Sequence, residues 1–198
     1  MRRSAGLGVV LALLVAAFVY GSHRGDGGST AAPQAAPDLA ALRTAAALAP
    51  CPSGLSPRLP ALAMPCVGAP GTVQARATGS GRPMVVNLWA TWCGPCVKEV
   101  PLLQSLHTRT RAVDVVGVLT EDSPEHALQF AQDPTLGFDM TYASVADDQG
   151  VLLRRYAKGP PVTLFVTADG AIAKVQRGAL SSQAQLDGLV RQYLGVTL

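Results

Sequence analysis

The stretch VVNLWATWCGPCVKEVP, residues 85–101, indicates the fold of this chain. An uninterrupted apolar run leads into two cysteines, Cys93 and Cys96, which are separated by Gly94 and Pro95. A short apolar run without alternation is typical of a parallel strand that is covered on both faces. The residues after the cysteines repeat apolar side chains at a spacing of three to four, which predicts a helix. We therefore expect Cys93 where a buried strand ends and a helix begins.

A cysteine in this position has a distinctive chemistry. The N-terminus of a helix carries a partial positive charge and free N–H groups, which stabilise a thiolate. Pro95 fits the first turn, where its missing N–H costs nothing. Cys96 lies within one turn of Cys93 and can close a disulfide with it. The pattern predicts thiol–disulfide exchange with other proteins, with Cys93 as the nucleophile and Cys96 as the resolving cysteine.

Two other interpretations of the cysteine pair remain as alternatives. A zinc site needs a second pair of ligands at suitable spacing, which Cys51 and Cys66 lack, and the three histidines are scattered along the chain. A purely structural Cys93–Cys96 bridge would close a loop too short to add much stability. We expect no metal and no cofactor.

The longer stretch WCGPCVKEVP, with Glu99 and Pro101, resembles the active site of the thioredoxin superfamily, and in particular its extracytoplasmic TlpA/ResA-like branch of redoxin-domain proteins. The segment KGPPVTLFVTADG extends the resemblance and places Pro161 on the cis-proline of that family. The resemblance implies a thioredoxin-like three-layer α/β/α sandwich with a mixed central sheet. It also implies a membrane-tethered protein-disulfide reductase whose cysteines alternate between dithiol and disulfide.

The residues expected to border a bound client are Trp92, Gly94, Pro95, Pro160 and Pro161. In the family, the residue before the cis-proline pairs through its backbone with an incoming extended chain. Pro160 has no N–H to offer, which puts the usual antiparallel recognition in doubt. Trp92 is expected to be exposed beside the site.

Asn87 stands where thioredoxins proper carry a buried aspartate that takes a proton from the second cysteine, and an amide cannot do so. Glu99 lies three residues after Cys96 on the same helical face, and helical side chains lean toward the N-terminus. We expect Glu99 to take over this proton, with a solvated surface glutamate as the alternative. Pro101 should kink the helix or divide it in two.

The rest of the domain is predicted from periodicity and capping residues. The predicted elements are a second buried strand at 113–119, a helix at 124–133 capped by Ser123, two strands joined at Asp169-Gly170, and a last helix capped by Ser182 with Gln185. The segment 134–156 is treated as a central insertion with a short strand at 138–142 and a short helix at 152–156.

Four regions are predicted along the chain: a membrane anchor or signal segment at 1–22, a flexible linker at 23–37, an N-terminal extension at 38–69, and the thioredoxin-like domain at 70–198. Two arginines precede the apolar run, so the positive-inside rule places the domain outside the cytoplasm. We favour an uncleaved single-pass anchor, and cleavage would give a secreted protein.

The extension should begin with a helix at 39–49, capped by Asp38 and ended by Pro50. Cys51 and Cys66 enclose a proline-rich loop after it. In an oxidising compartment we expect a structural disulfide between them. A second redox pair that relays electrons to Cys93 and Cys96 is the alternative.

Composition and charge narrow the partners. The net charge is +3, and two arginines lie at the extreme N-terminus, so nucleic acid is not expected as a partner. Abundant alanine, glycine and arginine suggest a GC-rich, actinobacterial source. The expected clients are exported proteins with disulfides, such as apocytochrome c, and the expected reductant is a membrane thiol-electron transporter.

The sequence leaves two alternative functions. The first is a peroxiredoxin-like thiol peroxidase, but Thr91 precedes Cys93 by two positions rather than the three of a Thr-x-x-Cys site. The second is a tethered binding or chaperone module that uses the groove beside Pro161.

Overall fold

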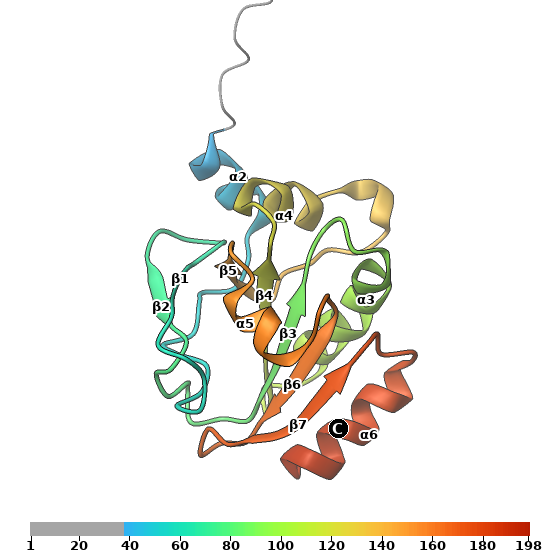
Figure 1. The fold of residues 1–198 in the computed structure, drawn as a ribbon. Coiled ribbons are helices and arrows are strands. Elements are labelled where there is room, and N and C mark those ends of the chain that lie inside the picture. The colour runs from blue at the N-terminus through green and yellow to red at the C-terminus, as the bar shows by residue number, and fades with distance from the viewer. Residues whose placement is uncertain (1–37) are drawn as a thin grey trace, which may run out of the picture. The chain divides into compact units, whose positions relative to one another are not determined.

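The computed structural model describes residues 38–198, and the predicted anchor and linker lie outside the described residues (Figure 1). The described elements, in chain order, are α2 (Leu39–Ala46), β1 (Ala63–Pro65), β2 (Thr72–Gln74), β3 (Met84–Trp89), α3 (Gly94–Arg109), β4 (Asp114–Thr120), α4 (Pro124–Ala131), the 3₁₀ turn η1 (Pro134–Leu136), β5 (Ala143–Asp147), α5 (Val151–Tyr156), β6 (Val162–Val166), β7 (Ile172–Arg177) and α6 (Gln183–Leu194). None of these helices is long and apolar enough to cross a membrane.

A mixed five-stranded sheet lies at the centre of the fold, in the order β5-β4-β3-β6-β7. Strands β3, β4 and β5 run parallel, and β6 and β7 are antiparallel to their neighbours. Every residue of β3 is buried, as expected for a strand covered on both faces. The mixed central sheet predicted from the sequence is confirmed.

Helices α3 and α6 cover one face of this sheet, and α5 and the β1–β2 hairpin cover the other (Figure 1). Because side chains alternate along a strand, β3 contributes to both cores. Val85 and Trp89 pack with Leu103 of α3 and Leu186 of α6. Neighbouring β3 residues pack instead with Leu152 of α5 and with residues of the hairpin.

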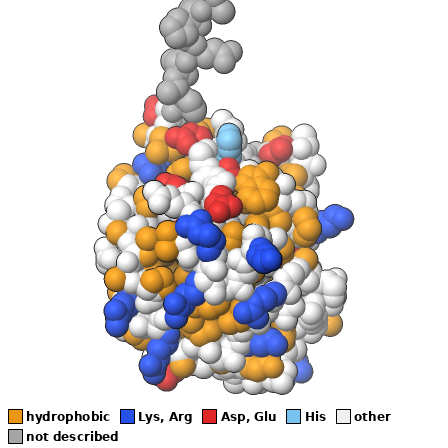
Figure 2. All heavy atoms as spheres, in the orientation of Figure 1, with side chains coloured by type: hydrophobic (Ala, Val, Ile, Leu, Met, Phe, Trp, Pro, Cys, Tyr) orange, Lys and Arg blue, Asp and Glu red, His pale blue; other side chains and the backbone are white. Residues whose placement is uncertain are grey.

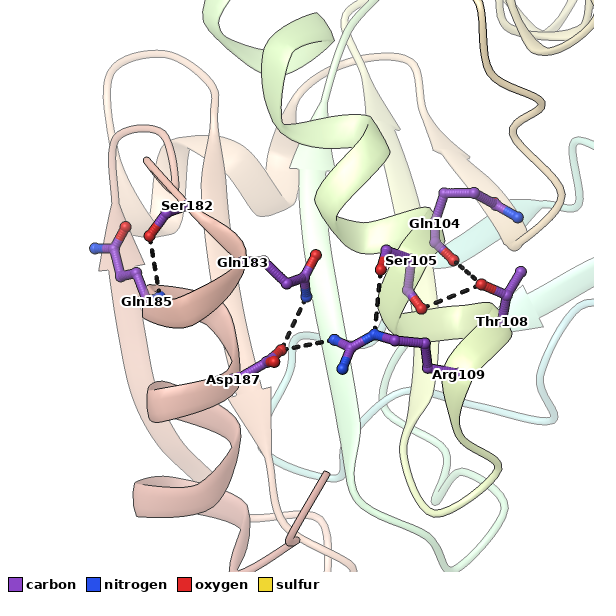
Figure 3. A network of polar contacts seen from close by, with 8 residues as sticks. All are labelled: Gln104, Ser105, Thr108, Arg109, Ser182, Gln183, Gln185 and Asp187. Atoms are coloured by element: carbon purple, nitrogen blue, oxygen red, sulfur yellow. Dashed lines mark hydrogen bonds and ion pairs between the residues drawn. The ribbon is translucent and has the colours of Figure 1, made fainter.

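Helix α3 is one continuous helix with Pro101 inside it, so the alternative of two separate helices is wrong. Its C-terminal end is tied to α6 by an ion pair in which Arg109 Nη2 lies 2.8 Å from Asp187 Oδ1 (Figure 3). Gln183 donates to the same carboxylate oxygen. These contacts hold α6 beside α3 at the end of the helix that is remote from the cysteines.

Two expectations about the ends of elements need correction. Helix α2 stops at Ala46, three residues earlier than expected, because Ala47 adopts a left-handed conformation with φ 47°. The predicted strand at 138–142 is absent from the described residues, and the strand forms instead at Ala143–Asp147. Its parallel pairing with β4 makes the segment treated as an insertion an integral edge of the sheet.

The predicted hairpin, the short helix near residue 152 and the capped C-terminal helix are confirmed. At the start of α6 the Ser182 hydroxyl accepts from the Gln185 N–H, as in a capping box. The Gln185 side chain, however, accepts from the N–H of Ser181, one residue before the cap.

The N-terminal extension is joined to the sheet through β5 and the β1–β2 hairpin. The hairpin pairs residues 63–65 with residues 72–74, so it spans the predicted boundary at residue 70. The Val67 N–H donates to the Ser144 carbonyl at 2.9 Å, and Cys66 forms a bridge with Val145. The extension thereby covers the outer edge of the sheet at β5.

Candidate active site

Cys93 is the N-cap residue of α3, at the position expected from the sequence. Its Sγ accepts a hydrogen bond from the Cys96 N–H at 3.2 Å, and Pro95 occupies the first turn. Cys93 and Cys96 form a disulfide with their Cα atoms 5.2 Å apart. The positive end of the helix therefore points at the sulfur of Cys93.

The two cysteines differ in access. Cys93 is 5% exposed, whereas Cys96 is fully buried beneath the first turn. Gly94 and Pro95 are exposed on the surface of that turn. An incoming disulfide therefore reaches Cys93 and not Cys96.

Trp92 is 57% exposed and is the most exposed large apolar side chain of the described residues. Its indole Nε1 donates to the Glu121 carbonyl at 3.2 Å, which joins the cysteine loop to the end of β4. Trp89, three residues earlier, is fully buried. The predicted division between an exposed and a core tryptophan is confirmed.

Asp122 holds the loop before Cys93, and sequence reasoning missed it. Its Oδ2 accepts from the N–H of Thr91 at 2.8 Å and from its hydroxyl at 2.6 Å, and Oδ1 accepts from the Ser123 N–H. His126 Nδ1 lies 2.9 Å from Oδ1. Burial alone would raise the Asp122 pKa, but these hydrogen bonds outweigh it and hold the pKa below its ordinary value.

Glu99 is fully buried, so the alternative of a solvated surface glutamate is wrong. Its Oε1 accepts from Asn87 Nδ2 at 2.6 Å, and its Oε2 accepts from the Leu180 N–H at 2.8 Å. Burial raises the pKa of Glu99 above its ordinary value, although both hydrogen bonds work in the opposite direction. A carboxyl with a raised pKa is suited to exchange a proton near neutral pH.

Asn87 is the partner that connects Glu99 to the sheet. It is fully buried in β3, and its Nδ2 also donates to Thr163 Oγ1 at 3.1 Å. Thr163 stands opposite Asn87 in the antiparallel pairing of β3 and β6. The sequence gives no local signal for Thr163 or for the Leu180 N–H, because Thr163 reaches Asn87, and the Leu180 N–H reaches Glu99, only through the tertiary fold.

Pro161 lies beside the end of β3 that leads to the cysteines. Val162, the first residue of β6, pairs with Leu88, so the proline precedes the strand at the same edge of the sheet. The Pro160–Pro161 peptide bond is cis, as the resemblance implies. The Pro161 carbonyl accepts from the Gly178 N–H at 3.0 Å.

Cys51 and Cys66 form the second disulfide, with Cα atoms 6.0 Å apart. Cys66 is buried, and Cys51 Sγ lies 3.3 Å from the Ser144 carbonyl oxygen of β5. This pair therefore joins the extension to the sheet edge, whereas the Cys93–Cys96 pair lies beyond the end of β3.

A mixed sheet of this order, with a cysteine pair at the N-terminus of the helix after β3, defines the thioredoxin-like class of proteins. The chain belongs to the Redoxin family, whose model matches residues 56–190. The family resemblance read from the sequence is confirmed.

Named relatives are thiol–disulfide proteins. The chain is 32% identical to the thiol-disulfide oxidoreductase ResA of Oceanobacillus iheyensis over 51% of this chain and 52% of that protein. It is 31% identical to the thiol:disulfide interchange protein DsbE of Pseudomonas fluorescens over 68% of this chain and 72% of that protein. The matched segment thus spans about half the length of the first of these relatives.

Solved structures support the same fold. A secreted Mycobacterium tuberculosis disulfide oxidoreductase described as homologous to Escherichia coli DsbE superimposes with a TM-score of 0.55 at 24% identity, covering 67% of this chain and 96% of that one. A thioredoxin-like protein from Porphyromonas gingivalis gives a TM-score of 0.56 at 22% identity, covering 71% and 94%. At these identities the likeness establishes the thioredoxin-like fold.

Proposed function

We propose that the protein is an extracytoplasmic thiol–disulfide oxidoreductase that reduces disulfides in exported proteins. The observation that carries this proposal is the disulfide-bonded Cys93–Cys96 pair at the N-terminus of α3, in a chain of the Redoxin family. The names of the ResA and DsbE relatives support the same activity.

The reaction moves two electrons from the dithiol to the client. The Cys93 thiolate attacks one sulfur of the client disulfide, forms a mixed disulfide and releases the other client sulfur as a thiolate. Cys96 then attacks the Cys93 sulfur, which frees the second client sulfur and leaves the Cys93–Cys96 disulfide. The helix N-terminus and the Cys96 N–H stabilise the Cys93 thiolate that makes the first attack, and they stabilise it again when the electron donor regenerates it from the disulfide.

Glu99 is the residue we assign to the proton of Cys96. It lies one helical turn after Cys96 in α3, is fully buried, and has a raised pKa. A group of this kind binds a proton more tightly than an exposed carboxylate and can accept one as the buried thiol ionises. Asn87 cannot take this proton, and its role is to hold the Glu99 carboxylate through Nδ2.

We assign client binding to the surface around Cys93. Exposed Trp92, Gly94 and Pro95 flank the sulfur on one side, and the Pro160–Pro161 segment lies beside the end of β3. Because Pro160 offers no N–H, apolar contact with Trp92 replaces part of the usual backbone pairing with a client chain.

The cycle requires an electron donor and a location. A membrane thiol-electron transporter would reduce the Cys93–Cys96 disulfide after each turnover. Residues 1–22 would anchor the chain in the cell membrane by a single pass, with the domain outside the cytoplasm. Apocytochrome c, whose cysteines must be reduced before haem attachment, and misoxidised exported proteins are the proposed clients.

Reduction of insulin disulfides with dithiothreitol as electron donor tests the activity. The wild-type chain should accelerate the reaction, Cys93→Ser should abolish the acceleration, and Cys96→Ser should stop after one mixed disulfide. A Cys51→Ala/Cys66→Ala variant that remains folded serves as the matched control and should retain activity. Wild-type activity equal to that of Cys93→Ser would refute the proposal.

The partners can be identified with the same trapping chemistry. Cys96→Ser in the native membrane should accumulate mixed disulfides through Cys93 that dithiothreitol releases. Clients and the electron donor can then be identified by mass spectrometry. Recovery of the same proteins with Cys93→Ser would show that they are not exchange partners.

The role of Glu99 has its own test. Glu99→Gln keeps the size of the side chain but cannot take a proton, so the rate of disulfide exchange should depend differently on pH. The control is Glu125→Gln, which changes a glutamate in the first turn of α4. An exchange profile of Glu99→Gln that coincides with the wild-type profile would remove Glu99 from the mechanism.

A further inference from the structure

A row of residues crosses the sheet directly beside Glu99. Gly117 of β4 stands opposite Asn87 of β3 on one side and opposite Ser144 of β5 on the other. Thr163 of β6 continues the row beyond Asn87. Residues that stand opposite one another point to the same face of a sheet, and for this row it is the face covered by α3 and α6.

Buried polar atoms without a protein partner gather on this row and beside it. Within residues 38–198, five buried side-chain N or O atoms have no hydrogen-bond partner, and four of them are Asn87 Oδ1, Trp89 Nε1, Tyr142 Oη and Ser144 Oγ. An unpaired buried polar group destabilises the folded protein, so such groups rarely cluster unless they share a partner.

Gly117 lets three of these side chains pack directly against the backbone of β4. A β-carbon built on Gly117 would lie 2.3 Å from Ser144 Oγ, 2.8 Å from Trp89 Nε1 and 3.3 Å from the edge of the Tyr142 ring. Three side chains from β3, β5 and the segment before β5 therefore converge on the single point where Gly117 lacks a side chain.

The geometry of the Asn87 amide directs its acceptor to the β4 side of the row. Its Nδ2 donates to Glu99 and to Thr163 on β6. Because the amide group is planar, Oδ1 points away from β6 and toward β4, where Gly117 stands. The cluster thus offers two donors, the indole N–H and the phenol O–H, and two acceptors, the amide oxygen and the Ser144 hydroxyl oxygen.

We propose that these four groups bind one internal water molecule over Gly117. Water accepts two hydrogen bonds and donates two, which matches two donors and two acceptors, and buried waters in proteins typically make about three such bonds. The extension and α3 hold the segment that carries Tyr142 and Ser144. The Ser144 carbonyl accepts from the Val67 N–H, and the Thr141 carbonyl accepts from the Ala49 N–H. Gln104 of α3 exchanges two hydrogen bonds with Thr141.

This water positions the carboxylate of Glu99 by acting through Asn87. A hydrogen bond to Oδ1 holds the amide with Nδ2 toward Glu99. The opposite orientation would aim Oδ1 at the carboxylate and remove the hydrogen bond that lowers the Glu99 pKa. Asn87, Ser144 and Tyr142 are therefore positioning residues. This role rests on the proposed function, in which Glu99 takes the proton of Cys96.

The pKa of Glu99 can be measured without turnover. The chain has three glutamates, so carboxyl carbon-13 NMR of the oxidised, full-length protein in detergent resolves Glu99 from Glu121 and Glu125, which serve as internal references. In the disulfide form Cys93 and Cys96 do not titrate. Tyr142 is the titratable group that couples electrostatically to Glu99, and its pKa is raised far above the range of the titration.

Ser144→Ala and Tyr142→Phe each remove one partner of the water while keeping most of the side-chain shape. In both variants we expect the acid dissociation constant of Glu99 to fall by a factor of about three to ten, the scale of one weakened hydrogen bond. The matched control is Thr120→Val, because Thr120 Oγ1 is the fifth unpartnered atom and stands on β4 three residues from Gly117, on the opposite face.

A crystal structure of the oxidised protein provides the direct readout. It should show one ordered water within about 3.2 Å of all four atoms, and Ser144→Ala should lose or displace it. The proposal would be overturned if the acid dissociation constant of Glu99 were unchanged in both variants, or if it changed equally in Thr120→Val. Absence of the water from well-ordered density would also overturn it. These results do not depend on activity, whereas failure of the wild-type chain to reduce insulin would refute the proposed function alone.

Discussion

Glu99 places a carboxyl group in a fully buried position between α3, β3 and the segment before α6. Its spacing from Cys96 predicts the helical face on which it lies. Burial depends on Asn87 and on the Leu180 N–H, which lies 81 residues away in the chain. The raised pKa therefore follows from the fold and not from the helix alone.

This raised pKa makes folding stability depend on pH. Folded Glu99 binds its proton more tightly than the unfolded chain does, so the free energy of unfolding should fall as pH rises from about 4.3 through the folded-state pKa. Glu99→Gln should lack this decline. Chemical denaturation of the oxidised wild type and of oxidised Glu99→Gln between pH 4 and 8 measures the free energy of unfolding of each as a function of pH. A difference between these two free energies that does not vary with pH would contradict the expectation.

At the scale of elements, α5 depends on a residue outside its own sequence. This six-residue helix begins after Gly150, whose side chain cannot cap it. Asp147, at the end of β5, accepts from the N–H groups of Val151, Leu152 and Leu153 at 2.9, 2.8 and 3.3 Å. The strand that precedes α5 therefore satisfies the first turn of the helix.

Asp147→Ala should lower the free energy of unfolding by about 1–2 kcal/mol, the usual effect of removing a helix cap, because buried N–H groups lose their acceptor. The neighbouring Asp148 is exposed and makes no such contact among the described residues, so Asp148→Ala should change stability by no more than about 0.5 kcal/mol. Urea denaturation of the two variants provides the comparison. Equal losses would show that Asp147 does not cap α5.

For the whole molecule, the extension closes one edge of the sheet. Cys66 and Val67 contact β5, and the Cys51–Cys66 disulfide fixes a loop that contains little core of its own. A bridge across a loop of this length is expected to contribute about 3 kcal/mol.

Cys51→Ala/Cys66→Ala should therefore lower the free energy of unfolding by about 3 kcal/mol.

In a Cys93→Ser/Cys96→Ser variant, the remaining disulfide should resist dithiothreitol at concentrations that reduce the active-site pair of the wild type. Thiol quantification across a dithiothreitol series measures this. Reduction of both pairs over the same range would favour the electron relay instead.

The charges of the molecule are also unevenly placed. Figure 2 shows Lys and Arg side chains spread over the middle and lower part of the visible face, while most Asp and Glu side chains on that face lie near its top. The segment that leads into Pro161 carries exposed Arg154, Arg155 and Lys158, and Arg177 is exposed beside it on β7. Apart from Arg154, which pairs with Glu121 at 3.5 Å, these side chains form no ion pair within the described residues.

This basic border should favour acidic clients. Of two disulfide peptides of equal length, the one with aspartates around its cysteines should be reduced faster than the one with lysines, and added salt should narrow the gap. Arg155→Glu/Lys158→Glu should reverse the preference, with Arg58→Glu as the control. Rates that do not depend on peptide charge would contradict this expectation.

The sequence by itself determines the cysteine pair, the buried strand that leads to it, the capped helices and the hairpin near the C-terminus, because each depends on periodicity and turn chemistry within a short stretch. It does not predict β5, which is short and gains its place by pairing with β4. The strand expected at 138–142 therefore forms instead at Ala143–Asp147.

Only the tertiary structure decides the environment of Glu99 and the cluster over Gly117. Asn87, Gly117, Ser144 and Thr163 come from four strands, and their common row exists only once the register of the sheet is set. Burial, hydrogen bonding and the resulting pKa of Glu99 arise from groups that are distant in sequence. The sequence thus specifies which sulfur atoms react, and the packed sheet specifies how the proton beside them is held.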